Sequence, residues 1–228
     1  MSIIKATNIH RKFGEGDLVA HVLKGIDIEV QEGEFIAIMG KSGAGKSTLM
    51  YQLSVLDEPT EGDIEIDGVC VSKLNEKERT AFRLETLGYV FQNYALVPDL
   101  SAEENVMLPL LMRGQDWKSA MERARHSLNN VGLEKKYTNL PAELSGGEQQ
   151  RVAIARALSG KPKIIFADEP TANLDSISGT AVIDLLTRLH RESKQTIVMV
   201  THEREYAMNC DRIIHMEDGL VVNIENLN

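Results

Sequence analysis

Short apolar runs bounded by turn residues dominate the first third of the chain. Residues 22–30 alternate in part between apolar and polar side chains, and residues 35–39 form a continuous apolar run. Residues 63–67 alternate apolar with acidic positions and lead into Asp67-Gly68, a hairpin-type turn. Alternation with a period of two is typical of half-buried strands, so this region is predicted to form an antiparallel layer beside the core.

The middle of the chain has the period of helices instead. Across residues 118–131, Met121, Ala124, Leu128 and Val131 stand at offsets 0, 3, 7 and 10, and Gly132 follows at a C′-like position. Residues 148–158 are predicted to form a second helix after a glycine pair. We therefore expect a helical insertion over about residues 92–158.

Strand and helix patterns alternate again toward the C-terminus. Residues 163–167 and 196–200 are apolar runs of strand length, and residues 176–191 between them have a helical pattern. Two further strand patterns, at 212–216 and 220–224, flank another hairpin signal, Asp218-Gly219. This alternation predicts an α/β core with a mostly parallel sheet.

Composition excludes several classes of protein. The 228 residues carry a formal charge of −9, which argues against a nucleic-acid binder that acts through a basic face. Two cysteines, Cys70 and Cys210, are too few for a disulfide framework and suit a reducing compartment. Because no run approaches the ~18 apolar residues of a membrane helix and the N-terminus does not have the pattern of a signal peptide, a cytoplasmic chain is expected. Any role at a membrane would come through a partner.

A glycine-rich loop carries the first chemical signal. It follows the apolar run 35–39, precedes a helix-compatible segment, and matches the phosphate-loop pattern at every required position. Backbone N–H groups of such a loop surround phosphate oxygens, Lys46 would reach the β- and γ-phosphates, and the Ser47 hydroxyl would coordinate Mg²⁺. The predicted nucleotide-binding residues of this loop are Gly40, Lys41, Ser42, Gly43, Ala44, Gly45, Lys46, Ser47 and Thr48.

Two acids, Asp168 and Glu169, end the apolar run that begins at Ile164. Ligand crevices of α/β folds form at the C-terminal ends of strands, so Asp168 is expected to serve Mg²⁺, through water, and Glu169 to polarise the attacking water. Adjacent side chains on an extended strand point to opposite sides, so one acid can face the metal while the other reaches round the strand end.

A second anion-binding turn lies in the segment 144–151, LSGGEQQR, where Ser145, Gly146 and Gly147 precede a helix. A small protein rarely needs two such turns for one nucleotide. We therefore expect a composite site in which one chain supplies the phosphate loop and a partner chain supplies this turn.

With LSGGEQQR, the chain resembles the ATP-binding cassette (ABC) family over essentially its whole length, with the motifs in family order. The resemblance implies a D-loop ending at Asp175, a Q-loop glutamine at Gln92 that serves Mg²⁺ or water, and a switch histidine at His202. It also implies that Phe13, expected in an N-terminal loop, stacks on adenine.

A finer resemblance concerns residues 91–106 and 56–63, which are similar to the group that serves lipoprotein release (LolD), macrolide export (MacB) and cell division (FtsE). The implied fold is a P-loop NTPase (RecA-like) core with an N-terminal antiparallel β subdomain and an inserted α-helical subdomain, all one ABC domain over 1–228. The core would comprise about 1–91 and 159–228. Because the sequence ends at Asn228 without a membrane span, it resembles the stand-alone type.

The resemblance further implies a head-to-tail homodimer with two ATP molecules between the subunits, each touched by Ser145 and Gly147 of the opposite chain. Glu169, His202 and Gln92 would carry hydrolysis. The helical subdomain would rest on integral membrane subunits at the cytoplasmic face, with no nucleic acid involved.

Several alternatives remain open. A P-loop kinase shares the phosphate loop but has no use for LSGGEQQR. A soluble ABC ATPase of translation or DNA repair usually carries a second cassette or a long coiled coil, and a binding module without chemistry would not need Lys46, Asp168, Glu169 and His202 together. An ABC importer subunit also fits, and the sequence does not indicate the substrate.

Overall fold

The structure is a computed structural model that describes residues 1–14 and 19–227. Its chain divides into two compact units, one formed by residues 1–80 with 190–228 and the other by residues 81–189. No helix among the described residues is both long and apolar enough to cross a membrane.

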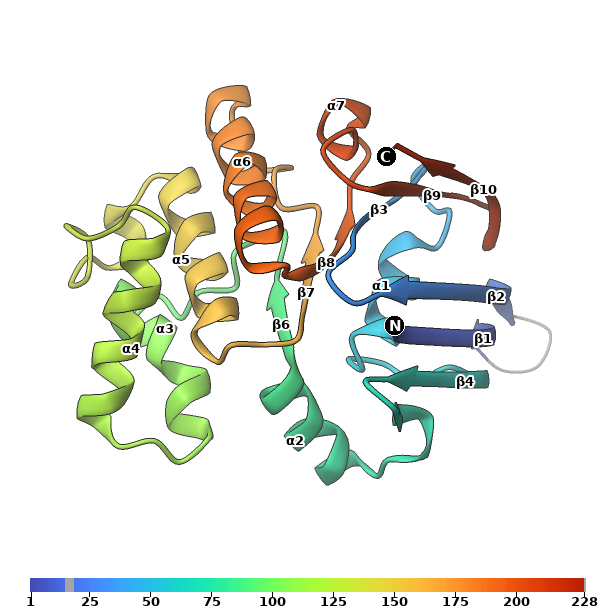
Figure 1. Ribbon diagram of the computed structural model, residues 1–228, viewed down its shortest axis with the longest axis horizontal. Helices are drawn as coiled ribbons and strands as arrows, with labels where there is room; N and C mark the ends of the chain where they lie inside the picture. The colour runs from blue at the N-terminus through green and yellow to red at the C-terminus, as the bar shows by residue number, and fades with distance from the viewer. Residues whose placement is uncertain (15–18, 228) are drawn as a thin grey trace. The chain divides into compact units, whose positions relative to one another are not determined.

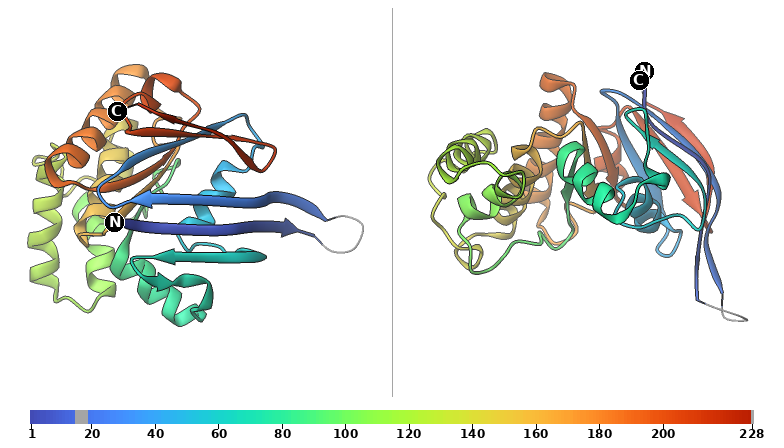
Figure 2. Two further views of the ribbon diagram at one scale, coloured as in Figure 1. Left: turned by 45° about the vertical axis from the view of Figure 1, so that its right-hand side comes forward. Right: turned by 90° about the horizontal axis from the view of Figure 1, so that it is seen from below.

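An antiparallel sheet in the first unit has the strand order β2-β1-β4-β5 (Figure 1). Its strands are β1 (Ser2–Phe13), β2 (Ala20–Gln31), β4 (Glu61–Ile66) and β5 (Val69–Cys70). The strands β1 and β2 run side by side as a long antiparallel pair in both views of Figure 2. Ile64 and Ile66 are buried while the alternate residues Asp63 and Glu65 face solvent, as the alternation predicts.

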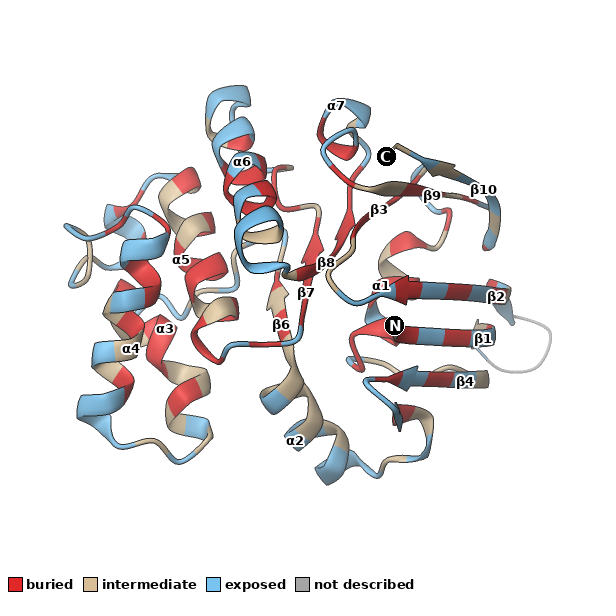
Figure 3. Cartoon of the chain, viewed as in Figure 1, coloured by how far each residue is buried: buried red, intermediate tan, exposed pale blue. Residues whose placement is uncertain are grey.

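The first unit also contains strands of a parallel arrangement: β3 (Phe35–Gly40), β8 (Thr196–Val200) and β9 (Arg212–Glu217), with β10 (Leu220–Asn226) antiparallel to β9. β3 lies between β8 and β9 and is parallel to both. Every residue of β8 is buried, and the strand is coloured as buried along its length in Figure 3. Two helices follow these strands, α1 (Lys46–Leu53) after β3 and α7 (Arg204–Ala207) after β8.

The second unit holds the parallel pair β6 (Leu87–Val90) and β7 (Ile164–Asp168). Three helices, α3 (Ala102–Met112), α4 (Trp117–Asn130) and α5 (Gly146–Ser159), come between these strands in the chain and pack on one another. α2 (Glu76–Thr86) and α6 (Ser176–Ser193) run across the unit boundaries, and two short 3₁₀ turns cover Val71–Lys73 and Pro141–Glu143.

Most predicted elements are confirmed to within two residues. The helical stripe of residues 118–131 is α4, and Gly132 follows its C-cap with φ +73°, the conformation that ends a helix. The sequence pattern does not predict β1, α2, α3 or the short helix α7. α2 buries no side chain and therefore has no apolar stripe, while α3 contains Pro109 and buries residues without a clear period. The limits predicted for the helical insertion, 92 and 158, stay a prediction.

Candidate nucleotide-binding site

The glycine-rich loop connects β3 to α1, as predicted from the flanking patterns. Gly40 has no room for a side chain, because a Cβ there would lie 2.2 Å from the backbone oxygen of Met216 on β9. Gly43 and Gly45 have φ values of +81° and +94°, which side-chain-bearing residues rarely adopt. The glycines are thus required for the path of the loop itself.

Lys46 is the first residue of α1 and is 7% exposed. Its ammonium donates hydrogen bonds to the carbonyl oxygens of Gly40 at 2.9 Å and Lys41 at 3.0 Å, so the charge is held within the loop. The N-cap residue, Gly45, offers no side chain to the first turn of α1. A positive charge and uncapped helical N–H groups at one place form a suitable cradle for phosphate.

Two other predicted residues of the first unit lie at the ends of strands. His202 is exposed and comes two residues after β8, and the Thr201 N–H beside it donates to the carbonyl of Ile38 on β3 at 3.2 Å. Because β3 and β8 are parallel neighbours, His202 and the phosphate loop emerge at the same edge of the sheet. Phe13 is the last residue of β1 and is 43% exposed, so its expected position in a loop is wrong.

In the second unit, Asp168 ends β7 and is 6% exposed. The phenol of Tyr89, on the neighbouring strand β6, lies 3.5 Å from Asp168 Oδ2. Glu169 has φ +42° and does not continue the strand. The expectation that the two acids alternate along an extended strand is therefore wrong, because the chain turns at Glu169 and this turn sets the direction of its side chain.

Gln92 is exposed just beyond β6, and its backbone is tied to the segment before α6. The Asn173 side-chain amide donates to the Gln92 carbonyl at 3.0 Å, and the Tyr94 hydroxyl donates to the Asn173 carbonyl at 3.3 Å. The Arg156 guanidinium on α5 donates to the carbonyls of Tyr94 and Ala95. These bonds connect the predicted Q-loop to the predicted D-loop and to the helix of the LSGGEQQR segment.

Ser145 is the N-cap of α5, which confirms the predicted helix start. Its hydroxyl accepts from the Glu148 N–H at 3.3 Å, and Glu148 Oε2 accepts from the Ser145 N–H at 2.8 Å, which together form a capping box. These hydrogen bonds, helped by Lys136, hold the pKa of Glu148 below its ordinary value. A Cβ on Gly147 would meet the Ser178 side chain at 3.0 Å.

Asp175 caps the next helix, α6. Its Oδ1 accepts from the N–H groups of Ile177 and Ser178, each at 3.0 Å, and its Oδ2 accepts from the Ser178 hydroxyl at 2.7 Å. These hydrogen bonds lower the pKa of the exposed carboxyl. Beyond the D-loop position that the resemblance implies, Asp175 therefore caps a helix of its own chain.

Taken by unit, the first holds Phe13, the phosphate loop and His202, and the second holds Gln92, Asp168, Glu169, Ser145 to Gly147 and Asp175. The roles assigned to these residues stay predictions. Tyr94 and Asn173 also help to fix the position of Gln92, and neither residue was predicted to do so. Asn173 stands two residues before Asp175 in the predicted D-loop, but nothing in the sequence indicates that its side chain bonds to a residue 81 positions earlier.

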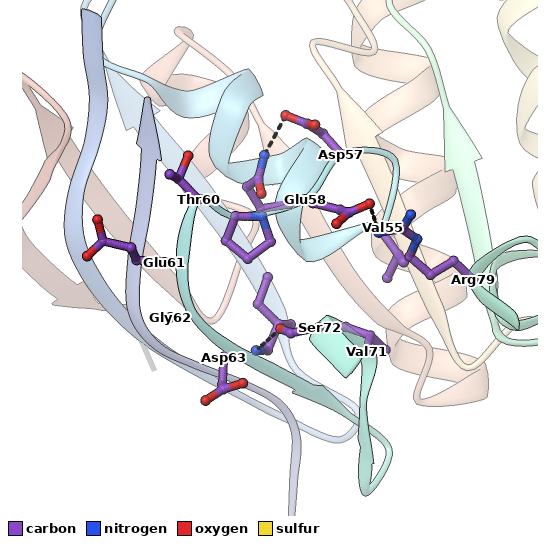
Figure 4. Close-up of a pocket in the computed structure, with 13 residues that line it drawn as sticks. Val55, Asp57, Glu58, Thr60, Glu61, Gly62, Asp63, Val71, Ser72 and Arg79 are labelled. Carbon is purple, nitrogen blue, oxygen red and sulfur yellow. Dashed lines mark hydrogen bonds and ion pairs between the residues drawn. The ribbon is translucent and has the colours of Figure 1, made fainter. Parts of the chain in front are cut away.

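A pocket of about 160 Å³ lies elsewhere in the first unit, between the loop after α1, β4 and α2 (Figure 4). Its lining includes Asp57, Glu58, Asp63 and Arg79, and it contains none of the predicted site residues. The nucleotide site is therefore assigned from the geometry of the phosphate loop and from the residues at the strand ends. This pocket is not part of that site.

The profile of the ABC transporter family matches residues 23–172. The chain is similar to the lipoprotein-releasing system ATP-binding protein LolD of Aquifex aeolicus, with 49% identity over 96% of each chain. It is 45% identical to the macrolide export ATP-binding/permease protein MacB of Neisseria meningitidis over 98% of this chain, which spans only 34% of that protein's length.

Among solved structures, the chain is similar to an ATP-binding cassette determined as a dimer in a post-hydrolysis state with ADP and Pi. The TM-score is 0.91, with 41% identity over 99% of both chains. At this level of identity the likeness extends to the family as well as to the fold.

Proposed function

Because this chain belongs to the ABC transporter family of ATP-binding proteins and is an ATPase of that type, we propose that it powers a membrane complex of the LolD or MacB kind. In this proposal the membrane-embedded part is a separate subunit, and the chain lies against the inner, cytoplasmic face of the membrane. The 49% identity to LolD, the ATP-binding protein of a lipoprotein-releasing system, supports a role in such a system.

The observation that carries the proposal is the phosphate cradle between β3 and α1. Its glycines allow a loop path that residues with side chains rarely adopt, and the Lys46 ammonium is held by the loop carbonyls. A site preorganised in this way stabilises charge without reorganisation during the reaction. Phosphoryl transfer depends mainly on such positioning and charge stabilisation.

The active form in this proposal is a head-to-tail dimer. Each ATP lies on the phosphate loop of one chain and meets the α5 N-terminus, Ser145 to Gly147, of the other. A two-fold axis makes both sites equivalent. The similar cassette solved as a dimer with ADP and Pi supports this arrangement.

Each residue of the proposed site has a separate role. Phe13 stacks on adenine, Lys46 neutralises charge on the β- and γ-phosphates, Glu169 accepts a proton from the attacking water, and His202 holds the geometry around the γ-phosphate. Gln92 responds to hydrolysis, and its hydrogen bond with Asn173 couples this response to the helices α3, α4 and α5. Loss of the γ-phosphate removes contacts made only in the closed dimer, so hydrolysis favours opening.

The donor set fits Mg²⁺. The Ser47 hydroxyl, the Asp168 carboxylate and the Gln92 amide offer the oxygen ligands that this ion prefers. Among the described residues, no group of three or more His, Cys, Asp or Glu side chains could hold a metal. Mg²⁺ usually keeps several waters and is bound together with substrate phosphates, so we expect phosphate and water to complete its coordination. When bound, the ion offsets negative charge on the phosphates.

Complementation between two inactive variants tests the composite site. Lys46→Ala disables the loop, and Ser145→Arg blocks the α5 turn. In a mixed dimer, one site combines both defects while the other has an intact loop and an intact turn. We expect phosphate release to reappear when the purified variants are mixed. Activity no greater than the sum of the two separate variants would contradict a site shared between chains.

A further inference from the structure

A cation covers one face of the Phe13 ring. The guanidinium carbon of Arg11, two residues earlier on β1, lies 4.4 Å from the centre of that ring. At this distance a guanidinium is attracted to the π electrons of the face it covers. Phe13 is 43% exposed, so part of its side chain is accessible to a ligand.

Arg11 is in turn held by a carboxylate from outside its strand. Its Nη2 donates to Asp57 Oδ1 at 2.8 Å, and the side chains of Arg11 and Asp57 are 22% and 30% exposed. Within the described part of the chain, the buried Nε of Arg11 has no hydrogen-bond partner. The position of the guanidinium therefore depends on Asp57 and on the aromatic ring.

Asp57 is fixed from the phosphate-loop helix. Its second oxygen, Oδ2, accepts from the Gln52 side-chain amide at 2.8 Å, the bond drawn as a dashed line at Asp57 in Figure 4. Gln52 stands in the last turn of α1, the helix that begins with Lys46, and is 1% exposed. Three consecutive contacts thus connect the phosphate-loop helix to the ring of Phe13.

We propose that Arg11 is a positioning residue that holds the Phe13 ring ready to stack on the adenine of the nucleotide, with Asp57 and Gln52 as its anchors. This inference rests on the proposed function, which assigns adenine stacking to Phe13. The exposed ring at the end of a strand would otherwise lose rotational freedom on binding, and a ring held in advance avoids part of that cost.

Titration calorimetry with two ligands distinguishes a residue that positions Phe13 from one that only forms a structural ion pair. ADP and pyrophosphate, each with Mg²⁺, are titrated into the full chain, because both contain the diphosphate and only ADP contains the adenosine. Arg11→Ala should weaken ADP binding roughly two- to fivefold, the range for a solvent-exposed cation–π contact, and leave pyrophosphate binding unchanged. Asp57→Asn, which changes few atoms, should shift ADP binding in the same direction.

A double-mutant cycle with Phe13→Ala completes the test. In the Phe13→Ala background, Arg11→Ala should have no further effect on ADP binding. Lys12→Ala is the matched control, since Lys12 is the adjacent cation on β1 and forms an ion pair with Glu61 at 2.6 Å. This control should alter neither titration.

Three results would overturn the role of Arg11: unchanged ADP binding in Arg11→Ala, equal weakening of ADP and pyrophosphate, or an ADP effect that persists without Phe13. Failure of the wild-type chain to bind ADP would instead overturn the proposed function, and this inference with it. If the wild-type chain binds ADP normally and any of the three results above is found, the role of Arg11 is overturned while the proposed function stands.

Discussion

The side-chain amide of Asn173 donates a hydrogen bond to the backbone carbonyl of Gln92 at 3.0 Å. The two residues stand 81 positions apart, one in the segment that leads to Asp175 and the other just beyond β6. The structure thereby ties together two segments that the family resemblance treats as separate motifs. This hydrogen bond restrains the position of one segment relative to the other.

Asn173→Ala should lower the maximal ATPase rate severalfold, because Gln92 loses the bond that fixes its backbone; a net hydrogen bond contributes about 1 kcal/mol. ADP affinity should remain near wild type, since the phosphate loop is unchanged. Steady-state kinetics and calorimetry measure the two quantities. Asn75→Ala, which removes an exposed amide that accepts from the Glu78 N–H, is the control, and an equal loss of rate in it would argue against a specific role of Asn173.

Ser145→Ala should reduce both stability and turnover. Loss of the N-cap hydroxyl costs about 1 kcal/mol, and loss of its contact with the γ-phosphate should slow hydrolysis on the order of tenfold. Ser101→Ala is closely matched, because Ser101 caps α3 through a capping box with the same distances, 3.3 and 2.8 Å. Chemical denaturation should show similar losses in both variants, with the ATPase defect confined to Ser145→Ala. The assignment of Ser145 fails if both variants hydrolyse ATP alike.

Acid should weaken the cap of α5. Hydrogen bonds from Ser145 hold the folded pKa of Glu148 below its ordinary 4.5, so the carboxylate stabilises the fold above that pH and this contribution disappears as the pH falls through the lowered folded value. Glu148→Gln keeps an acceptor at this position but does not titrate. Urea unfolding at pH 7 and at pH 3.5 should therefore show a smaller loss of stability on acidification in Glu148→Gln than in wild type. A larger loss would contradict the sign of the shift.

Gly40→Ala should disrupt the phosphate loop, because its Cβ would lie 2.2 Å from the Met216 carbonyl oxygen and β3 and β9 would have to separate. Both the free energy of unfolding and the ADP affinity should fall. Gly68→Ala provides a comparison, since Gly68 has φ +76° but nothing within 4 Å of its would-be Cβ. Its cost should be about 1 kcal/mol of backbone strain, with ADP affinity retained. Retained ADP binding in Gly40→Ala would show that the loop tolerates the side chain.

The sequence predicted elements whose signal is local. Because β4 and α4 each bury one face, their apolar residues recur with the period of a strand and of a helix. The glycines between β3 and α1 mark the position of the phosphate loop. Prediction from the sequence failed for features that depend on residues far apart in the chain or that leave no mark on the hydrophobic pattern. α2 buries nothing, and the turn at Glu169 is a backbone conformation that no apolar period records. The contacts of Gln92 with Asn173 and of Arg11 with Asp57 join distant positions and required the structure.

In the proposed function, Glu169 is the base that acts on water in an ATP-bound dimer. Its most direct test measures phosphate release and molar mass for wild type and Glu169→Gln, each with Mg²⁺ and either ATP or ADP. The neutral amide cannot accept the proton, so Glu169→Gln should release phosphate at least a hundredfold more slowly, consistent with the roughly 10²–10⁴-fold contribution of a general base. The same variant should form a stable dimer with ATP and remain monomeric with ADP. Phosphate release at the wild-type rate, or a molar mass that does not respond to ATP, would contradict this account.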